Sequence, residues 1–289
     1  FEYYAPCEEG FECMLDELRK AEKYIFMEYF IIEEGVMWNS ILSILEEKAK
    51  QGVEVRVMYD DMGSLNTLPA SYVKVLQKKG IKAVSFNRIS PIINIIMNHR
   101  DHRKILVIDG KVAFSGGANL ADEYINKKIV HGHWMDNIIC VKGNAVWSYL
   151  VTFLTNWNAL CHEDEDYTVF KNTETIDESN WDGYIAPYAE TPLDEELTGQ
   201  CIYEDILNSA NRYVYIMTPY LIIDSEMINT LIHTAKKGVD VRIIMPGIAD
   251  KKIIHDIGES YYAGLIQGGV KIYEYEPGFV HSKVFISDD

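Results

Sequence analysis

The sequence has no long apolar run, few cysteines and no excess of basic charge. No run of apolar residues approaches the roughly 20 that a membrane-spanning helix needs. The five cysteines include no C-x-x-C pair, which argues against a disulfide framework or a zinc site and favours a reducing compartment. The formal net charge of −17 argues against a nucleic-acid partner, because such proteins need a basic face. Any contact with an anionic membrane must therefore be local.

The chain is nevertheless rich enough in apolar side chains to fold. Hydrophobic residues make up 48% of the 289 residues and aromatic residues 12%, which suits one large domain or two fused halves. The sequence starts at Phe1 without a signal peptide and stops at Asp289, directly after a predicted strand. We therefore expect a fragment of a longer protein.

An internal repeat is the strongest organisational pattern. The stretch AEKYIFMEYFII from Ala21 is followed by AKQGVEVRVMYDD from Ala49, and ANRYVYIMTPYLII from Ala210 is followed by AKKGVDVRIIMPG from Ala235. Each pair predicts a buried strand, a helix that ends at a glycine, and a second strand. Because strands alternate with helices, the repeat predicts an α/β fold built of parallel-type units.

The repeat divides the chain into two halves. We expect the first half at residues 1–161 and a second, truncated half at residues 184–289. Between them, residues 162–183 are acidic, polar and poor in aliphatic side chains, which is typical of a linker or surface excursion.

The same short motif, H-x-K-x4-D, follows the third predicted strand of each half. It comprises His102, Lys104 and Asp109 in the first half and His281, Lys283 and Asp288 in the second. A single match arises by chance in about one chain of thirty, but two matches at equivalent points of a repeat are far rarer. For the two aspartates we favour structural roles at strand ends, either capping a turn or pairing with a basic group.

The spacing within the motif indicates phosphodiester chemistry. Residues i and i+2 of a strand share a face, so each histidine projects beside its lysine. If the halves face one another across a pseudo-two-fold axis, two imidazoles and two ammonium groups meet in one pocket. One imidazole can then form a phosphohistidine, while the other protonates the leaving alkoxide and later deprotonates the incoming hydroxyl. The ammonium groups can hold the non-bridging oxygens, so the scheme needs no metal or other cofactor.

Other polar residues near the motif have simpler interpretations. Asn119 follows a glycine pair in SGGANLADEY, where its amide could reach a phosphate oxygen or could simply belong to a turn. We interpret His99 as a structural loop residue. His131 and His133 come without a third ligand, which predicts a polar loop rather than a metal pair.

Four segments resemble the phospholipase D superfamily and, within it, the bacterial cardiolipin synthases: NHRDHRKILVIDG, GGANLADEY, TPYLIID and YEYEPGFVHSKVFISDD. The resemblance implies two phospholipase-D-like repeats, each a mixed β-sheet flanked by helices, that form a pseudo-two-fold pseudo-dimer around one shared active site. It implies that His102 is the nucleophile and His281 the general acid and base. Lys104, Lys283 and Asn119 would contact the phosphate.

The resemblance also implies a carboxylate that orients a histidine. Asp136, in the segment Trp134-Met135-Asp136, would hydrogen-bond His102 and fix its tautomer. Glu123 is an alternative, and a plain strand-edge role for Asp136 stays open. The family also carries a segment with an asparagine after the second motif, and the sequence stops before that point.

The activity that the resemblance implies is that of a phosphatidyltransferase. Such an enzyme makes cardiolipin from two phosphatidylglycerol molecules and releases glycerol. The resemblance also implies membrane-anchoring helices before Phe1 and a catalytic part on the cytosolic side of the bacterial cytoplasmic membrane. Within the apolar stretch ISPIINIIMNH, the residues Ile92, Ile93 and Ile96 are candidates for contact with an anionic phospholipid surface, or else part of an ordinary buried strand.

Two other functions stay open. A hydrolytic phospholipase D or another phosphodiesterase would use the same residues, because acceptor choice depends on pocket shape and water exclusion. An inactive α/β scaffold that binds lipid or a protein is the second alternative, which the presence of both histidine–lysine pairs disfavours.

Overall fold

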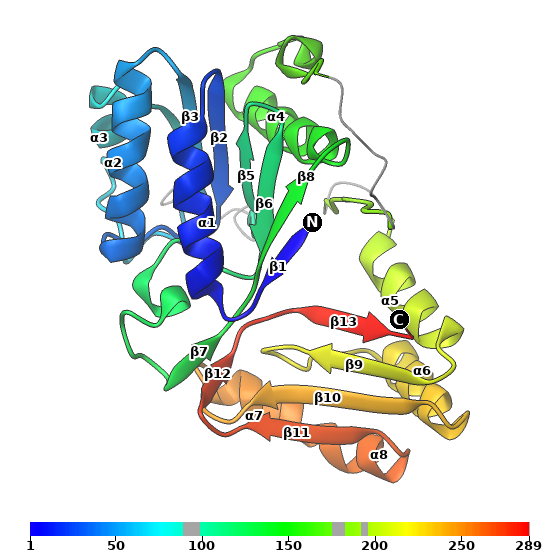
Figure 1. Cartoon of the computed structure of the whole chain (residues 1–289). Coiled ribbons are helices and arrows are strands. Elements are labelled where there is room, and N and C mark those ends of the chain that lie inside the picture. Colours follow the sequence, from blue (N-terminus) through cyan, green and yellow to red (C-terminus); the bar gives the residue numbers. More distant parts are fainter. Residues whose placement is uncertain (89–98, 175–182, 192–195, 289) are drawn as a thin grey trace. The chain divides into compact units, whose positions relative to one another are not determined.

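The computed structural model describes residues 1–88, 99–174, 183–191 and 196–288 (Figure 1). The predicted membrane contacts at Ile92, Ile93 and Ile96 lie outside these residues. The chain forms two compact units, one of Phe1–Lys127 with Asn137–Ala189 and one of Lys128–Asp136 with Glu190–Asp289. Within the described residues, no helix combines the length and the apolar character that crossing a membrane requires.

The first unit is built on a seven-stranded mixed sheet. Its strands are β1 (Glu2–Tyr4), β2 (Tyr24–Tyr29), β3 (Glu54–Asp60), β4 (Lys82–Phe86), β5 (Lys104–Ile108), β6 (Val112–Gly116) and β8 (Ile138–Lys142). Their order is β1-β8-β6-β5-β2-β3-β4, in which β2, β3 and β4 run parallel and the other neighbours are antiparallel. All six residues of β2 are buried, as expected for a strand that is covered on both faces.

Helices cover both faces of this sheet, with α1 and α2 on one side and α4 on the other (Figure 1). They are α1 (Cys7–Lys20), α2 (Val36–Lys50), α3 (Tyr72–Lys78) and α4 (Val146–Cys161), with the short 3-10 helices η2 (Asp122–Ile125) and η3 (Tyr167–Phe170). Alternate residues of β2 point to opposite faces. Phe26 therefore stacks on Phe153 of α4, with 5.1 Å between the ring centroids.

The start of the acidic segment after α4 packs onto the first unit. The guanidinium group of buried Arg56, on β3, donates from Nη1 and Nη2 to the two carboxylate oxygens of Glu165 at 2.7 and 2.8 Å. Phe170 packs edge-on against Phe26. This part of the predicted linker or surface excursion is therefore anchored to the sheet.

The second unit repeats four neighbouring strands of the first. Its strands are β9 (Tyr213–Met217), β10 (Asp240–Pro246), β11 (Lys271–Tyr275) and β13 (Val284–Ser287), and its helices are α5 (Thr198–Ser209), α6 (Ser225–Lys236), α7 (Lys252–Ser260) and α8 (Tyr262–Gln267). The sheet order β11-β10-β9-β13 matches β4-β3-β2-β5, with three parallel strands and one antiparallel strand in both. The predicted two-repeat α/β fold is thereby confirmed. Buried residues alternate along β9 and β10 and form a core with α5, α6 and α8.

A separate parallel pair of strands also belongs to the second unit. It joins β7 (His133–Met135) to β12 (Gly278–Val280). Gly278 lies opposite His133, where a Cβ atom would come within 2.2 Å of the His133 backbone oxygen, so the pairing requires glycine. A segment that the sequence places in the first half, residues 128–136, thus forms part of the second unit.

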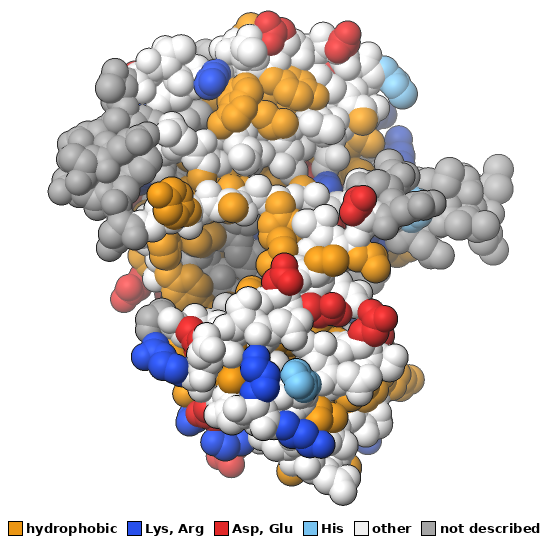
Figure 2. Space-filling view, turned by 90° about the vertical axis from the view of Figure 1, so that its right-hand side faces the viewer, with side chains coloured by type: hydrophobic (Ala, Val, Ile, Leu, Met, Phe, Trp, Pro, Cys, Tyr) orange, Lys and Arg blue, Asp and Glu red, His pale blue; other side chains and the backbone are white. Residues whose placement is uncertain are grey.

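Charged side chains of both signs are interspersed on the face shown in Figure 2. Among the described residues drawn on that face, several basic side chains lie near one another, with acidic side chains above and beside them. The described residues on this face form no continuous basic surface of the kind that a nucleic-acid binder presents.

Candidate active site

The first motif lies at the start of β5. Lys104 opens this strand opposite Tyr29 of β2 and is buried, whereas His102 is exposed. Lys104 Nζ donates a hydrogen bond to the backbone oxygen of His102 at 2.5 Å. The ring of Phe30 lies 5.4 Å from Lys104 Nζ and 4.8 Å from the His102 ring. One aromatic side chain therefore contacts both motif residues.

A buried polar group flanks His102. Glu28 on β2 is fully buried and accepts a hydrogen bond from Asn156 Nδ2 at 2.8 Å. Arg103 Nη1 lies 3.6 Å from a carboxylate oxygen of both Glu28 and Asp101. Burial raises the pKa of Glu28 well above its ordinary value, and the neighbouring Asp101 raises it further. The sequence analysis missed this group, whose only signal is a single acid within the apolar run of β2.

The chain that enters the motif is also held by Asp60, at the end of β3. This buried carboxylate accepts a hydrogen bond from the Asp101 N–H at 3.0 Å and lies 3.1 Å from Arg100 Nη1. It also accepts from the backbone N–H groups of Met62 and Gly63. Burial raises the pKa of Asp60, although these donors oppose the shift. The residues on both sides of His102 are thus fixed to the sheet.

Asn119 lies buried in the first unit. Its Oδ1 accepts the Ile31 N–H at 3.1 Å, and its Nδ2 donates to the Tyr124 hydroxyl at 2.8 Å. An amide nitrogen carries two hydrogens, so these bonds orient the group and leave a second hydrogen for an anion. Contact with phosphate stays a prediction.

The second motif is shaped by the β7–β12 pair. In this register Met135 lies opposite Val280, so the following residues, Asp136 and His281, come side by side. Asp136 Oδ2 lies 2.6 Å from His281 Nδ1, and both residues are buried. The His281 N–H donates to the Met135 oxygen at 2.7 Å. The structure therefore gives Asp136 a histidine partner in the second motif, and its orienting role toward His102 stays a prediction.

Lys283 repeats the geometry of the first lysine. Its Nζ donates to the backbone oxygen of His281 at 2.5 Å and lies 3.0 Å from both ring nitrogens. The residue as a whole is exposed, but desolvation at the ammonium group lowers the pKa of Lys283 to about 8. The His281 ring packs against Trp134 and Phe279, at 5.7 and 6.1 Å between centroids. Both motifs therefore couple a lysine to the backbone of its histidine.

The two motif aspartates bind backbone in the same way. The Asp109 carboxylate accepts the N–H groups of three successive residues that lead into β2, each at 2.8 Å. The Asp288 carboxylate accepts three equivalent N–H groups that lead into β9. Both residues have positive φ, 54° and 48°, which aspartate tolerates in tight turns. In this arrangement each aspartate ties its motif strand to the first strand of its own repeat.

The remaining predicted site residues lie elsewhere. Glu123 is half-buried in η2, in the first unit. His99 precedes the motif, and its backbone oxygen accepts from Asn87. His133 Nδ1 lies 3.0 Å from the Tyr275 hydroxyl, and the His131 ring packs near Phe279.

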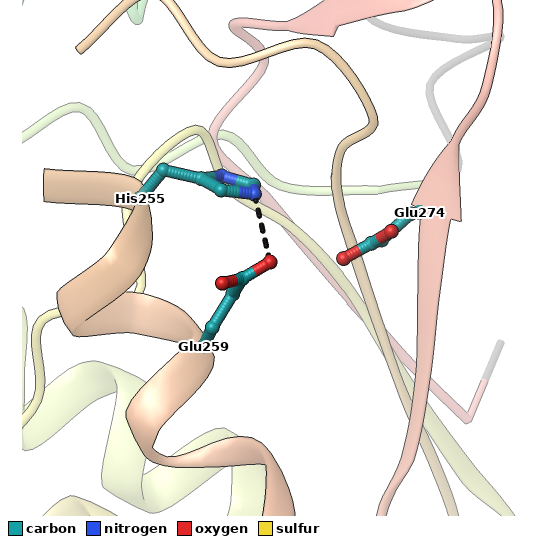
Figure 3. A group of neighbouring side chains, drawn as sticks. All are labelled: His255, Glu259 and Glu274. Atoms are coloured by element: carbon teal, nitrogen blue, oxygen red, sulfur yellow. Dashed lines mark ion pairs between the residues drawn. The ribbon is translucent and has the colours of Figure 1, made fainter. Parts of the chain in front are cut away.

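Another polar group in the second unit contains no motif residue (Figure 3). His255 and Glu259, one turn apart on α7, face Glu274 on β11, with their ligand atoms within 4.8 Å of one another. His255 Nε2 lies 3.4 Å from Glu259 Oε1, and Tyr262 donates to Glu274 at 3.4 Å. In the part of the chain that the structure describes, this is the one group that could hold a metal ion. The phosphodiester scheme makes no use of it.

Comparison with known proteins adds sequence relatives and a structural neighbour. A family model described as "Cardiolipin synthase, PLD-like domain" matches residues 14–150 and 203–289. An uncharacterized protein of Streptococcus mutans serotype c is 53% identical over 99% of this chain and 62% of its own length. Cardiolipin synthase 2 of Bacillus anthracis is 37% identical over 97% of this chain and 54% of its own length. The chain thus spans little more than half the length of these relatives.

One structural neighbour is a phosphatidylserine synthase from Haemophilus influenzae Rd KW20. Its crystal structure matches with a TM-score of 0.66 and 14% identity, over 99% of this chain and 75% of that one. At this identity the likeness concerns the fold.

Proposed function

Because the chain belongs to the cardiolipin synthase family of phospholipase-D-like domains, we propose that the protein is a phosphatidyltransferase. It transfers a phosphatidyl group from one phosphatidylglycerol to another, makes cardiolipin and releases glycerol. The observation that carries the proposal is the duplicated histidine–lysine geometry, in which each Nζ is bonded to the backbone oxygen of its histidine at 2.5 Å. The proposal requires that both imidazoles reach one phosphorus atom.

In the first step, an imidazole nitrogen of His102 attacks phosphorus and the bond to the glycerol oxygen breaks. Protonated His281 gives its proton to that oxygen, so glycerol leaves as a neutral alcohol and the phosphatidyl group stays on His102. In the second step, His281 takes the proton of a hydroxyl of the second phosphatidylglycerol. That oxygen attacks phosphorus, the phosphorus–nitrogen bond breaks, and cardiolipin leaves with both histidines restored.

The surroundings of the histidines support this division of roles. The Asp136 carboxylate beside His281 Nδ1 favours the protonated ring and suits a residue that gives and takes a proton. His102 is exposed on an anchored loop, which suits a nucleophile that must reach a substrate. Lys104 and Lys283 supply positive charge for the non-bridging oxygens as negative charge builds up in the transition state. Asn119 would add one amide hydrogen.

The substrates also place the reaction at a membrane surface. Both phosphatidylglycerol molecules are lipids, so we propose that the site works on the cytosolic side of the bacterial cytoplasmic membrane. Membrane attachment through other parts of the protein belongs to the same proposal.

Product analysis tests the reaction. Purified protein is incubated with phosphatidylglycerol vesicles, and the products are identified by mass spectrometry. Cardiolipin and glycerol in equal amounts support transfer. Phosphatidic acid in place of cardiolipin indicates hydrolysis, and no product in a protein that is folded would favour the inactive scaffold. His102→Ala and His281→Ala serve as controls and should each abolish turnover.

A further inference from the structure

One imidazole and two carboxylates converge in the second unit, in a group that contains no motif residue. His255 and Glu259 lie one turn apart on α7, and Glu274 lies on β11. Figure 3 shows the imidazole ring and the two carboxylates pointing toward one another. One ligand atom of each residue lies within 4.8 Å of those of the other two. A helix and a strand thus present three possible metal ligands to one point.

The spacing of these atoms suits a shared metal ion. Zinc binds imidazole nitrogen and carboxylate oxygen at about 2.0–2.2 Å, so two ligands of a tetrahedral ion lie about 3.3–3.6 Å apart. His255 Nε2 and Glu259 Oε1 lie 3.4 Å apart, which falls in this range and exceeds the length of about 2.7–2.9 Å of a charge-assisted hydrogen bond. Glu274 is exposed, so its side chain can rotate to complete the set.

The two carboxylates bring together negative charge that no lysine or arginine side chain balances in the described parts of the chain. Glu259 and Glu274 each place an oxygen within 4.8 Å of the other, and like charges at this distance repel. Among the ion pairs of the described residues, His255 is the one basic partner of either carboxylate. A divalent cation bound between the carboxylates would replace this repulsion by attraction to both.

The surroundings hold two of the ligands in place. The side chain of His255 is only 15% exposed, so its neighbours restrict the ring. The Tyr262 hydroxyl donates a hydrogen bond to Glu274 Oε1 at 3.4 Å. Because a carboxylate has two oxygens, Tyr262 can hold one of them while the other binds an ion, as outer partners of metal ligands do. This support lowers the entropy that the ligands lose when an ion binds.

The types of donor atom select the class of ion. Imidazole nitrogen suits zinc and the neighbouring divalent transition metals, whereas magnesium and calcium prefer oxygen ligands alone. The group contains no cysteine, so the lack of a C-x-x-C pair, which argues against a thiolate zinc site, does not apply to it. Three protein ligands leave the fourth position of a tetrahedral ion to water.

We propose that His255, Glu259 and Glu274 bind a divalent transition metal ion of the zinc class, which clamps α7 to β11. Gly258 is the one buried residue of α7, and β11 stands at the edge of its sheet, next to β10. A metal bridge between these two elements closes a loop in the chain and stabilises the second unit. The ion has a structural role, and the phosphodiester steps do not use it.

Isothermal titration calorimetry of the metal-free chain with zinc chloride tests the site. The parent chain should bind one zinc ion and keep it in an excess of magnesium. His255→Ala and Glu274→Gln should each lower the zinc affinity by more than about 100-fold, because loss of a ligand costs more than the 10- to 100-fold of an outer-partner change. Tyr262→Phe should lower it by about tenfold. The matched control His233→Ala replaces an exposed histidine on α6 of the same unit and should bind like the parent.

Thermal melts and cobalt spectra distinguish this site from adventitious binding. Zinc should raise the melting temperature of the parent and of His233→Ala but not of His255→Ala, because an ion that binds the folded state stabilises it. With a chelator present, all three should melt alike, which verifies the fold of the variants. Cobalt(II) bound in place of zinc should show visible d–d bands without the charge-transfer band of a thiolate ligand.

Several results would overturn the proposal: a parent chain that does not bind zinc, unchanged binding in His255→Ala and Glu274→Gln, an equal loss in His233→Ala, or displacement of zinc by magnesium. A thiolate band with cobalt(II) would also overturn it, because the ion would then lie on a cysteine. Zinc binding that leaves the melting temperature of the parent unchanged would refute the clamp.

Discussion

Replacing Asp136 by asparagine tests how the second histidine is prepared for proton transfer. Asp136 is fully buried, and its Oδ2 lies 2.6 Å from His281 Nδ1. Asparagine keeps the size and can still accept a hydrogen bond, but it removes the negative charge that stabilises an imidazolium. Asp136 acts through His281 and is therefore a positioning residue.

The size of the effect follows from this one contact. A hydrogen bond to a charged group contributes about 1.5–3 kcal/mol. If that contribution is lost as the imidazolium forms, kcat should fall roughly 10- to 150-fold. KM should change by less than about twofold, because interactions made only in the transition state affect kcat alone.

The assay compares two donors that differ in the leaving group: phosphatidylglycerol and the para-nitrophenyl ester of phosphatidic acid. Glycerol leaves only with a proton, whereas nitrophenolate is stable without one. Asp136→Asn should therefore slow transfer from phosphatidylglycerol and leave the first turnover of the nitrophenyl donor unchanged. Asp240→Asn is the control, because it removes a carboxylate that pairs with Arg242 and Lys271 in the same unit. Equal losses with both donors, or none with either, would refute the reasoning.

Further substitutions test separate parts of the account. A pH–rate profile should show kcat/KM falling as pH rises past about 8, because the Lys283 ammonium group loses its proton there. Lys283→Arg should move this fall to higher pH, because a guanidinium group stays protonated. Glu28→Ala should lower the free energy of unfolding by about 1–3 kcal/mol, because Asn156 Nδ2 loses its acceptor. The pKa of Glu28 is raised in the folded state, so its contribution is present at low pH and lost as pH rises through that pKa. Glu28→Gln should flatten this loss with rising pH in denaturant titrations at several pH values. Asp109→Ala should destabilise the fold by about 2–4 kcal/mol, because three backbone N–H groups lose their acceptor. Asp288→Ala should destabilise it by less, because Asp288 is more exposed. Thermal melts check both variants, and an unchanged melting temperature would contradict the proposed role in holding the backbone.

The repeat could be predicted from the sequence because it depends on local patterns. Apolar runs and glycine-terminated helices recur along both halves. The structure shows the same repeat, because the strand order β11-β10-β9-β13 matches β4-β3-β2-β5. The contact between each lysine and its histidine also follows from a spacing of two residues.

The partner of Asp136 could not be predicted in this way. Its contact with His281 joins residues 145 positions apart through β7 and β12, each only three residues long. Such short strands carry no periodicity that assigns them to one half or the other. The segment Trp134-Met135-Asp136 correctly signals a carboxylate at the end of a strand, but only long-range pairing decides which histidine it meets.

Glu28 shows a second limit. A single acid in an apolar strand normally indicates a solvated position, yet β2 is covered on both faces and leaves Glu28 fully buried. Its neighbours Asp101 and Arg103 flank His102 in the sequence, but their meeting with Glu28 depends on the antiparallel pairing of β2 with β5. The polar support of the first histidine therefore becomes visible only in the folded chain.

The central claim is that histidines from separate repeats act in turn on one phosphorus atom. Its most direct test is mass spectrometric mapping of a covalent adduct in His281→Ala after reaction with the nitrophenyl donor. This donor needs no acid in the first step, and the variant lacks the base for the second, so a phosphatidyl group should accumulate on His102. The adduct should be absent in His102→Ala. No adduct on His102 in His281→Ala, or an adduct that persists when His102 is replaced, would contradict the claim.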